Sequence, residues 1–250
     1  MSQEKGFSLS SPNIIVVVLL VIIVAVVIWQ FPSLGEDVEE GQDVDVEGLI
    51  GEPEESKFSN PDIVESSAEL DLEVLPHTGV LDTADYAIVE FTDFLCPFCE
   101  QHGRDTFPKI SEEFLNEQVV YIFSDMPMMD PQASMDLSVA GMCIYHNSDI
   151  NELLDYRAMA YDINNPNEEN ILEVVKELEV DTAKFKDCYQ DQEYSDALEN
   201  NLDVGSDAGV TGVPGFLIGE LSEEGVVEGY RLSGALPYED FEEVLNYLMD

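Results

Sequence analysis

The chain has very few basic residues, and this shortage limits the partners that it can bind. Lysine and arginine together number 9 among 250 residues, whereas aspartate and glutamate number 54, so the formal net charge is −45. Proteins bind the nucleic-acid backbone mainly through lysine and arginine, so we exclude nucleic acid as a partner. The chain also lacks an internal repeat and a glycine-rich loop of the kind that binds phosphate. Its chemistry must therefore come from other motifs.

The excess of acids also bears on the solvent in which the chain folds. Repulsion among so many like charges destabilises a compact fold in dilute buffer. At about 1 M salt the Debye length falls to about 3 Å, and the repulsion is largely screened. We therefore predict a halophilic host. The alternative is a single acidic protein from an ordinary organism.

Charge is absent from residues 6–35, and residues 14–29 are sixteen consecutive apolar residues. A helix over residues 14–31 would be about 27 Å long, close to the roughly 30 Å hydrocarbon core of a bilayer. No small-residue A-x-A cleavage site follows, and no cysteine precedes Cys96, which disfavours a cleaved signal peptide and a lipoprotein. We predict an uncleaved, single-pass anchor at residues 13–31 in the cell membrane, with residues 1–12 in the cytoplasm and the remainder outside it.

An acidic segment follows the predicted anchor. Residues 36–55 contain ten acids and no base, together with three glycines and one proline. Self-repulsion keeps such a segment extended. We predict an acidic flexible linker over residues 32–69 and a folded domain over residues 70–250. Within that domain, residues 70–75 alternate like an edge strand.

Two of the four cysteines form the most informative motif of the chain, C-P-F-C at residues 96–99. Residues 86–93 before it have the composition of a strand, and residues 100–116 after it have the apolar spacing of a helix. The thiolate is the attacking species in disulfide exchange, and a helix N-terminus lowers the pKa of a thiol placed there. The pattern predicts a thiol–disulfide exchange site with Cys96 as the nucleophile and Cys99 as the resolving thiol.

Two segments around this motif resemble one known family. They are I-V-E-F-T-D-F-L-C-P-F-C at residues 88–99 and G-V-T-G-V-P-G-F-L-I-G at residues 209–219. Both are similar to the DsbA-like branch of the thioredoxin superfamily. The resemblance implies an α/β thioredoxin fold with an inserted helical subdomain, which we place at about residues 131–207.

The resemblance also implies roles for single residues. Glu90, six positions before the motif, falls where the family keeps a buried acid that relays protons to the resolving cysteine. Pro214 falls where the family has a cis-proline beside the active disulfide, and Val213 before it resembles the oxidase branch. We expect Val213 and Pro214, together with Pro97 and Phe98, to bind substrate.

Two positions depart from the family pattern. Phe98 has no side-chain donor for a thiolate, so any large lowering of the pKa of Cys96 must come from backbone N–H groups. Gly215 replaces the threonine that commonly follows the proline, and nothing in the sequence explains this change.

These features predict a membrane-anchored, extracytoplasmic thiol-disulfide oxidoreductase that introduces disulfides into exported proteins through Cys96 and Cys99. Its partners would be exported cysteine-containing proteins and, as the resemblance implies, a quinone-linked membrane reoxidase. Two alternatives stay open. One is a disulfide isomerase or reductase that uses the same site, and the other is a tethered thioredoxin-fold module that binds or delivers metal.

The other two cysteines, Cys143 and Cys188, lie far apart in the sequence. They form either a structural disulfide or two separate buried thiols, since free cysteine is common in protein cores. An even number of cysteines in an oxidising compartment favours the disulfide. Some members of the family carry a second disulfide in this domain.

We predict no metal and no cofactor. Cys96, Cys99 and His102 have ligand-like spacing, and the three methionines within residues 126–129 are soft donors for copper. Zinc sites usually supply a second close pair of cysteines, which the chain lacks. Our default interpretation of all three histidines is a surface or hydrogen-bonded position, and they are His77, His102 and His146.

Hydrophobic periodicity predicts the remaining elements. We expect strands at residues 119–125, 216–219 and 225–232. We expect helices at residues 132–145, 150–161, 168–178 and 182–190, another that ends near residue 206, and one after residue 237.

Overall fold

The computed structural model describes residues 56–116, 118–163 and 165–250. The predicted anchor at residues 13–31 and residues 32–55 of the predicted linker lie outside these ranges. Among the helices that the structure describes, none combines the length and the apolar character needed to cross a bilayer.

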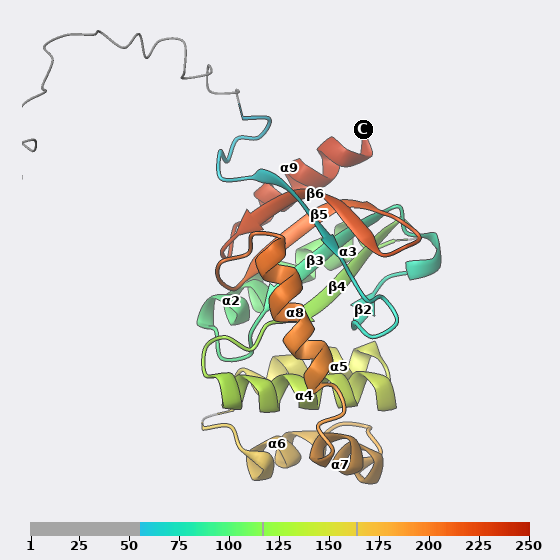
Figure 1. The fold of residues 1–250 in the computed structure, drawn as a ribbon, viewed down its shortest axis with the longest axis vertical. Helices are drawn as coiled ribbons and strands as arrows, with labels where there is room; N and C mark the ends of the chain where they lie inside the picture. Colours follow the sequence, from blue (N-terminus) through green and yellow to red (C-terminus); the bar gives the residue numbers. More distant parts are fainter. Residues whose placement is uncertain (1–55, 117, 164) are drawn as a thin grey trace, which may run out of the picture. The chain divides into compact units, whose positions relative to one another are not determined.

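A six-stranded sheet lies at the centre of the fold, in the strand order β1-β6-β5-β3-β4-β2 (Figure 1). Its strands are β1 (Val64–Glu69), β2 (His77–Thr78), β3 (Tyr86–Thr92), β4 (Val119–Asp125), β5 (Gly215–Leu221) and β6 (Val226–Ser233). Strand β3 pairs in parallel with β4 and antiparallel with β5, so it runs through the middle of the sheet. Six of the seven residues of β3 and all of β4 are buried. Both strands are covered on both faces, as their continuous apolar runs predict.

The helices connect the strands and cover the sheet. They are α2 (Pro97–Asp105), α3 (Phe107–Glu113), α4 (Pro131–Asn147), α5 (Ile150–Ala160), α6 (Glu168–Val175), α7 (Thr182–Gln190), α8 (Ser195–Asp207) and α9 (Tyr238–Met249), with a short 3-10 turn, η3 (Leu81–Thr83). Helices α4 to α8 lie between β4 and β5 in the chain. They form the helical insertion that the sequence predicts.

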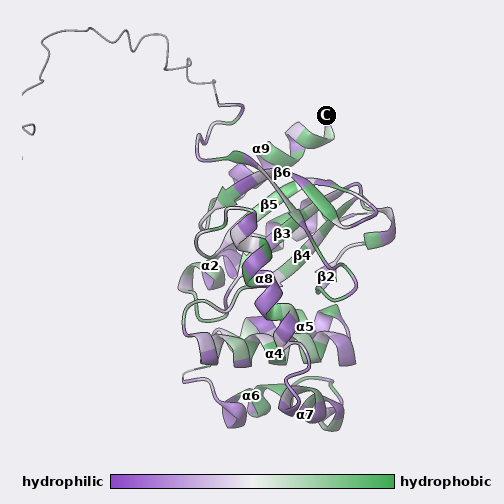
Figure 2. Cartoon of the chain, in the orientation of Figure 1, coloured by the Kyte–Doolittle hydropathy of each residue, from purple (hydrophilic) through white to green (hydrophobic). Residues whose placement is uncertain are grey.

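Alternate residues of the central strands face two different layers of side chains, as the two-residue period of a strand requires. Ile88 and Tyr121 share an apolar cluster with side chains of α3 and α9. Val89 and Ile122 share another with residues of α8. Figure 2 shows these strands largely in the hydrophobic colour, whereas much of the helical surface is hydrophilic. The sheet is therefore sandwiched, and side chains of β3 that point towards α3 and α9 lie out of water.

The helical insertion has a core of its own, which includes Leu137, Ile144 and Phe185. Helices α6 and α7 lie on the side of α4 and α5 that is remote from the sheet (Figure 1). Each of the four begins at a side chain that accepts hydrogen bonds from the first turn, and these caps are Asp130, Asp149, Asn167 and Asp181. Asp and Asn are among the best N-caps, which explains where these helices start.

The single helix predicted over residues 100–116 is wrong, because the structure has two helices, α2 and α3, that meet at Thr106. Pro108 has no N–H to donate to the turn before it, and its ring clashes there, so a helix cannot run through it unbroken. It stands instead near the start of α3, where a missing N–H costs nothing. The break leaves α2 as a short helix that carries both active-site cysteines.

The predicted boundary between linker and domain is also wrong. Strand β1 pairs antiparallel with β6, and Phe58 and Ile63 before it are buried in the core. Part of the range 32–69 therefore belongs to the folded domain. The edge strand predicted at residues 70–75 is a turn, in which the Asp71 carboxylate accepts the N–H of Glu73. Such local bonds from aspartate compete with strand pairing.

Candidate active site

Cys96 is the N-cap of α2, directly after the loop that leaves β3. Pro97 occupies the first helical turn, where its fixed φ suits the helix. Both Cys96 and Cys99 are free thiols. Cys99 is fully buried and Cys96 keeps 3% of its surface exposed, whereas the ring of Phe98 between them is 60% exposed. A substrate therefore reaches Cys96 beside an accessible aromatic side chain.

The two thiols have opposite pKa shifts. The pKa of Cys96 is lowered to about 6, mainly by a hydrogen bond from the Cys99 thiol, with smaller contributions from the backbone N–H groups of Cys99 and Phe98. Burial raises the pKa of Cys99 well above its ordinary value, and its bond to Cys96 adds to this. Cys96 is thus the thiolate near neutral pH, and Cys99 keeps its proton. The backbone donors expected for Cys96 are present.

The predicted substrate-binding loop lies against Cys96. The Val213–Pro214 peptide bond is cis. When Cys96 is protonated, its Sγ donates a hydrogen bond to the carbonyl oxygen of Val213, at 3.3 Å, although the two residues are 117 positions apart. The structure also explains Gly215, because a Cβ at this position would lie 2.7 Å from a side-chain methyl of Val210. A threonine does not fit there without a shift of its neighbours.

Asp93, three residues before Cys96, is a buried site residue that the sequence did not single out. Its Oδ1 accepts the N–H of Leu95 and the hydroxyl of Ser134, at 2.8 and 2.9 Å. Its Oδ2 accepts the N–H groups of Met128 and Met129, at 2.7 and 2.9 Å. One carboxylate therefore holds together the loop before Cys96, the loop after β4 and the start of α4. An aspartate next to a predicted strand end gave no signal for this role.

Glu90, the predicted proton relay, is 2% exposed on β3, and its charge is among the causes that raise the pKa of Cys99. Its Oε2 accepts a hydrogen bond from the Tyr121 hydroxyl at 3.0 Å. His102 Nε2 lies 2.9 Å from that same hydroxyl oxygen. His102 stands three residues after Cys99 and so on the same face of the helix. The sequence grouped it with Cys96 and Cys99 only as a candidate metal ligand, and it did not connect Tyr121 or His102 with Glu90.

A buried ion pair supports the site from the helical insertion. Arg157 on α5 donates to Asp125 Oδ1 at 2.8 Å, and both side chains are buried. The guanidinium lies over the rings of Phe94 and Phe123, 4.8 and 4.6 Å from their centroids. Burial alone would lower the pKa of Arg157, but the charges of Asp125, Tyr161 and Glu90 and the hydrogen bond to Asp125 together outweigh it, so the guanidinium stays charged.

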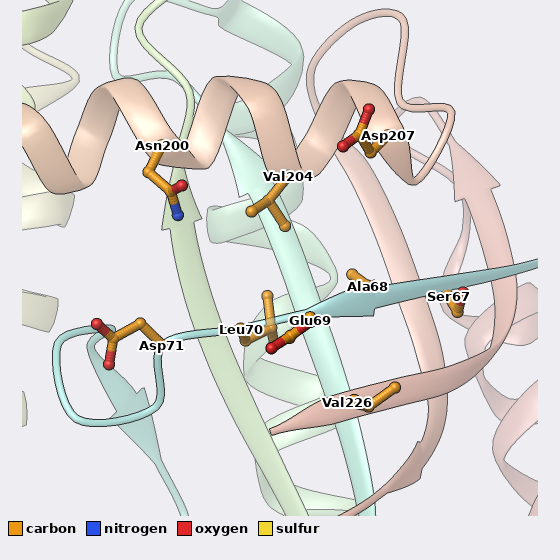
Figure 3. A pocket seen from close by; sticks show the side chains of 9 residues that line it. All are labelled: Ser67, Ala68, Glu69, Leu70, Asp71, Asn200, Val204, Asp207 and Val226. Atoms are coloured by element: carbon orange, nitrogen blue, oxygen red, sulfur yellow. The ribbon is translucent and has the colours of Figure 1, made fainter. Parts of the chain in front are cut away.

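A cavity of about 220 Å³ adjoins Glu90 and Arg157, and it is also lined by Arg104, Phe107 and Tyr161. A second hollow, of about 830 Å³, lies between β1 and α8 (Figure 3). None of the nine described residues that line this second hollow is basic or a cysteine. We assign it no role in thiol chemistry.

The two remaining cysteines form a disulfide. Cys143 on α4 and Cys188 on α7 are joined, with their Cα atoms 5.9 Å apart. The bond therefore links two helices within the insertion. It lies in the insertion's own core and not beside the motif at residues 96–99.

The histidines and methionines of the described residues lie in different surroundings. His102 is buried against Tyr121 and is not at the surface, whereas His146 is exposed and bonds to a backbone carbonyl. Met126 is buried, and Met128 and Met129 are exposed. Within the described residues, no group of three His, Cys, Asp or Glu side chains is placed so that it could hold a metal ion.

Comparisons with known proteins agree with this geometry. The family profile described as Thioredoxin matches residues 77–245. A curated relative, the probable disulfide bond formation protein D of Bacillus anthracis, is 25% identical over 145 residues, which cover 55% of this chain and 66% of that protein. The match thus spans slightly less than two thirds of the relative.

Solved structures show the same fold. Chlamydia trachomatis DsbA has a TM-score of 0.60 at 18% identity and covers 72% of this chain and 94% of its own. The thiol-disulfide exchange protein alpha-DsbA2 of Wolbachia pipientis has a TM-score of 0.57 at 23% identity, covering 71% and 88%. BdbD of Bacillus subtilis has a TM-score of 0.56 at 16% identity, covering 74% and 99%. With a profile match over more than half of its length, the chain belongs to the thioredoxin family, and its fold is that of the DsbA-like structures.

Proposed function

We propose that this chain is a thiol-disulfide oxidoreductase that introduces disulfides into exported proteins. The observation that carries the proposal is a pair of thiols at the start of α2 whose pKa values are shifted in opposite directions. Cys96 has a lowered pKa, while Cys99 is buried and protonated behind it. Such a pair combines a good leaving group towards substrate with a resolving thiol that solvent does not reach.

The proposed cycle begins with the oxidised pair, in which Cys96 and Cys99 share a disulfide. A substrate thiolate attacks Cys96 Sγ, the Cys96–Cys99 bond breaks, and Cys99 leaves as a thiolate that takes up a proton. A second substrate thiolate then attacks the substrate sulfur of the mixed disulfide and releases Cys96 as a thiolate. The substrate gains a disulfide, and the enzyme carries away two electrons as a dithiol.

The lowered pKa of Cys96 supports the oxidase direction of exchange. A lowered pKa stabilises the reduced enzyme, and a stabilised reduced form makes the disulfide form a stronger oxidant. The cycle also needs an acceptor for the two electrons. We propose a quinone-linked membrane reoxidase for this step, because an exported dithiol must be reoxidised outside the cytosol.

The place of action rests on the sequence. The sixteen apolar residues at 14–29 support a membrane anchor, and the disulfide chemistry supports an extracytoplasmic domain with the N-terminus inside. The charge of −45 supports a halophilic host. Protease added to intact cells should digest the C-terminal domain, and a domain that stays protected would contradict this topology.

The test of the activity is the oxidation of a reduced protein substrate by the oxidised full-length chain, followed by the substrate's regained enzymatic activity. We expect wild type to oxidise it and Cys96→Ser to be inactive, because the active-site disulfide that the substrate thiolate attacks cannot form without Cys96. Cys99→Ser should be inactive as well, because Cys96 without Cys99 has no disulfide to give. The matched control is wild type reduced at this pair, which has no disulfide to give. Oxidation by Cys96→Ser would overturn the mechanism.

The redox state of Cys96 and Cys99 in cells distinguishes an oxidase from an isomerase or reductase. Cells are quenched in acid and free thiols alkylated, with Cys96 and Cys99 counted apart from Cys143 and Cys188. A mostly disulfide pair at Cys96–Cys99 supports the oxidase. A mostly dithiol pair would contradict it and indicate an isomerase or reductase at the same site.

A further inference from the structure

We propose that Tyr121 and His102 extend the proton relay of Glu90, so that His102 stores the proton that Glu90 exchanges with Cys99. The inference rests on the proposed function, because the relay serves the resolving thiol. It concerns three side chains on three different elements: Glu90 on β3, Tyr121 on β4 and His102 on α2.

The hydrogen bonds form one continuous chain. Tyr121 Oη lies 3.0 Å from Glu90 Oε2 and 2.9 Å from His102 Nε2. A hydroxyl has a single proton, so Tyr121 donates to one neighbour while it accepts from the other. In one state, protonated Glu90 donates to Tyr121, and Tyr121 donates to the neutral imidazole. In the other, imidazolium donates to Tyr121, and Tyr121 donates to the carboxylate.

The change from the first state to the second moves one proton from Glu90 to His102. The Glu90 O–H bond breaks as the Tyr121 oxygen takes that proton, and the Tyr121 hydroxyl proton passes to His102 Nε2. Tyr121 is a hydroxyl before and after. A carboxylic acid and a neutral imidazole become a carboxylate and an imidazolium, and the net charge of the three groups does not change.

Because His102 is buried, it can hold a proton but cannot release it to solvent. Its side chain is fully buried, and its ring lies 4.4 Å from the ring of Phe216 and 5.3 Å from that of Phe241, centroid to centroid. His102 Nδ1 has no hydrogen-bond partner among the described residues. A proton that reaches His102 must therefore return through Tyr121.

The Glu90 end of the chain is different. Glu90 Oε1 also has no partner among the described residues, but Glu90 lines the cavity of about 220 Å³. This volume has room for several waters, at about 30 Å³ each. Leaving two buried polar atoms unpaired costs about 1–3 kcal/mol each, so a static role poorly explains the arrangement. Unpaired atoms at both ends of one hydrogen-bonded chain are what a proton relay requires.

The charges around His102 couple its protonation to that of Glu90. Burial lowers the pKa of His102, the charge on Glu90 raises it, and the charge of Arg157 lowers it. The side chains from β5 and α9 that pack on the ring are the uncharged Phe216 and Phe241. The imidazolium is therefore favourable mainly when Glu90 is a carboxylate. When Glu90 passes its proton to His102, Glu90 becomes a carboxylate that can take the proton of Cys99. The imidazolium balances its charge, so no net charge enters the core.

Stopped-flow oxidation of the reduced full-length chain by excess dithiobis(nitrobenzoate) separates the two thiols. The first release of coloured thiol reports attack by Cys96. The second reports closure of the disulfide by Cys99, which requires loss of the Cys99 proton. The first phase is thus an internal control for an intact nucleophile in every variant.

The decisive variant is His102→Gln. Its side-chain N–H still donates to Tyr121, but the amide cannot take up a proton. We expect the second phase to slow by about tenfold to a hundredfold, the range of general acid–base contributions, with the first phase unchanged. The pH profile of the second phase should also lose one ionisation. A second phase within about twofold of wild type at every pH would overturn the proposal, whatever role the histidine has in packing.

Tyr121→Phe gives a second, independent variant. It breaks the chain, so it should slow the second phase as much as His102→Gln, and the double variant should be no slower than either. Additive effects would overturn the relay. Tyr156→Phe is the matched control, because its buried hydroxyl donates to the Leu137 carbonyl at 3.0 Å, outside the relay. It should leave both phases unchanged.

Histidine labelled with ¹⁵N in the full-length chain gives a readout that needs no activity. His102 should show a mixture of neutral and protonated ring in wild type and a neutral ring in Glu90→Gln. An unchanged His102 spectrum in Glu90→Gln would overturn the coupling. These outcomes are independent of the substrate-oxidation test, in which failure of Cys96 would end the proposed function itself.

Discussion

At the residue scale, the reactivity of Cys96 depends most on one neighbour. The hydrogen bond from the Cys99 thiol lowers the pKa of Cys96 more than either backbone donor does. Phe98 contributes its backbone N–H and not its side chain. The exposed ring of Phe98 is therefore free to contact substrate, while the backbone of the same residue stabilises the thiolate.

We predict that alkylation of Cys96 by iodoacetamide is half-maximal near pH 6. The lowered pKa means that the thiolate predominates above this pH, so the rate should be flat at higher pH and fall about tenfold per unit below it. The measurement is the alkylation rate of Cys96 against pH, read by mass spectrometry of the peptide.

Two variants at Cys99 test whether its hydrogen bond is what lowers the pKa of Cys96. Cys99→Ala removes the donor, so the midpoint should move to higher pH, whereas Cys99→Ser keeps a donor and should move it less. Equal midpoints in wild type and Cys99→Ala would contradict the assigned cause.

Arg157 is a second residue whose surroundings set its role. Arg157→Met should destabilise the fold by about 3–5 kcal/mol, because it leaves the buried carboxylate of Asp125 without its partner. Burial raises the pKa of Asp125, so the loss should be smaller in acid, where this carboxyl is protonated. Urea unfolding at several pH values measures it.

Arg104→Met is the control for Arg157. Arg104 pairs with Glu100 and Asp162 at the surface, where ion pairs contribute little. We expect little change in its unfolding midpoint. Similar losses for the two arginine variants would contradict the importance of burial.

At the element scale, proline and aspartate decide where helices begin and end. Pro108 divides the apolar run after Cys99 into α2 and α3. The short α2 places its N-terminus at Cys96, while His102 in its second half lies against Tyr121 of β4. His102 of α2 and Tyr121 of β4 thus meet near the active site. The apolar spacing over residues 100–116 indicated one long helix and did not reveal this contact.

The Cys143–Cys188 disulfide should stabilise the insertion. It closes a loop over 45 positions, for which the chain-entropy estimate is about 4 kcal/mol. We predict that replacing both cysteines with alanine lowers the free energy of unfolding by about this amount. The measurement is urea unfolding of the full-length chain under non-reducing conditions.

Reduction provides the control for that prediction. Added reductant should destabilise wild type towards the level of the alanine double variant, and it should change the double variant much less. A double variant as stable as oxidised wild type would contradict a stabilising disulfide.

At the scale of the whole molecule, the net charge of −45 should make stability depend on salt. We predict that the urea midpoint rises between about 0.1 M and about 2 M potassium chloride, because screening shortens the range of repulsion from about 10 Å to below about 3 Å. The control variant neutralises exposed acids of the insertion, for example Glu173, Glu177 and Asp187. It should show a smaller rise, and a midpoint that is independent of salt would contradict the prediction.

Much of the site was predictable because its chemistry is local. The motif at residues 96–99 specifies a nucleophile at a helix start, and the resemblance placed Glu90, Val213 and Pro214 around it. In the structure Glu90 is buried and the Val213 carbonyl oxygen lies beside Cys96. Strands at the centre of a sheet are continuous apolar runs, so β3 and β4 were found at their true positions.

The errors have physical reasons as well. Alternation at residues 70–75 indicated a strand, but the Asp71 side chain forms a local turn, and β1 lies just before it. Strand β1 is mostly exposed, and four of its six residues are polar, which is also the composition of a linker. Composition cannot distinguish an exposed strand from an extended segment, because both are polar.

By itself, the sequence determined the thiol pair, the helix that activates it, the two apolar layers of the sheet and the excess of negative charge, because each depends on neighbours along the chain. Only the tertiary structure decided that Asp93 ties two loops to the start of α4, that Val210 leaves no room for a side chain at Gly215, and that His102 meets Glu90 through Tyr121. These contacts join residues far apart in the sequence, and the packing of helices on a sheet is what brings them together.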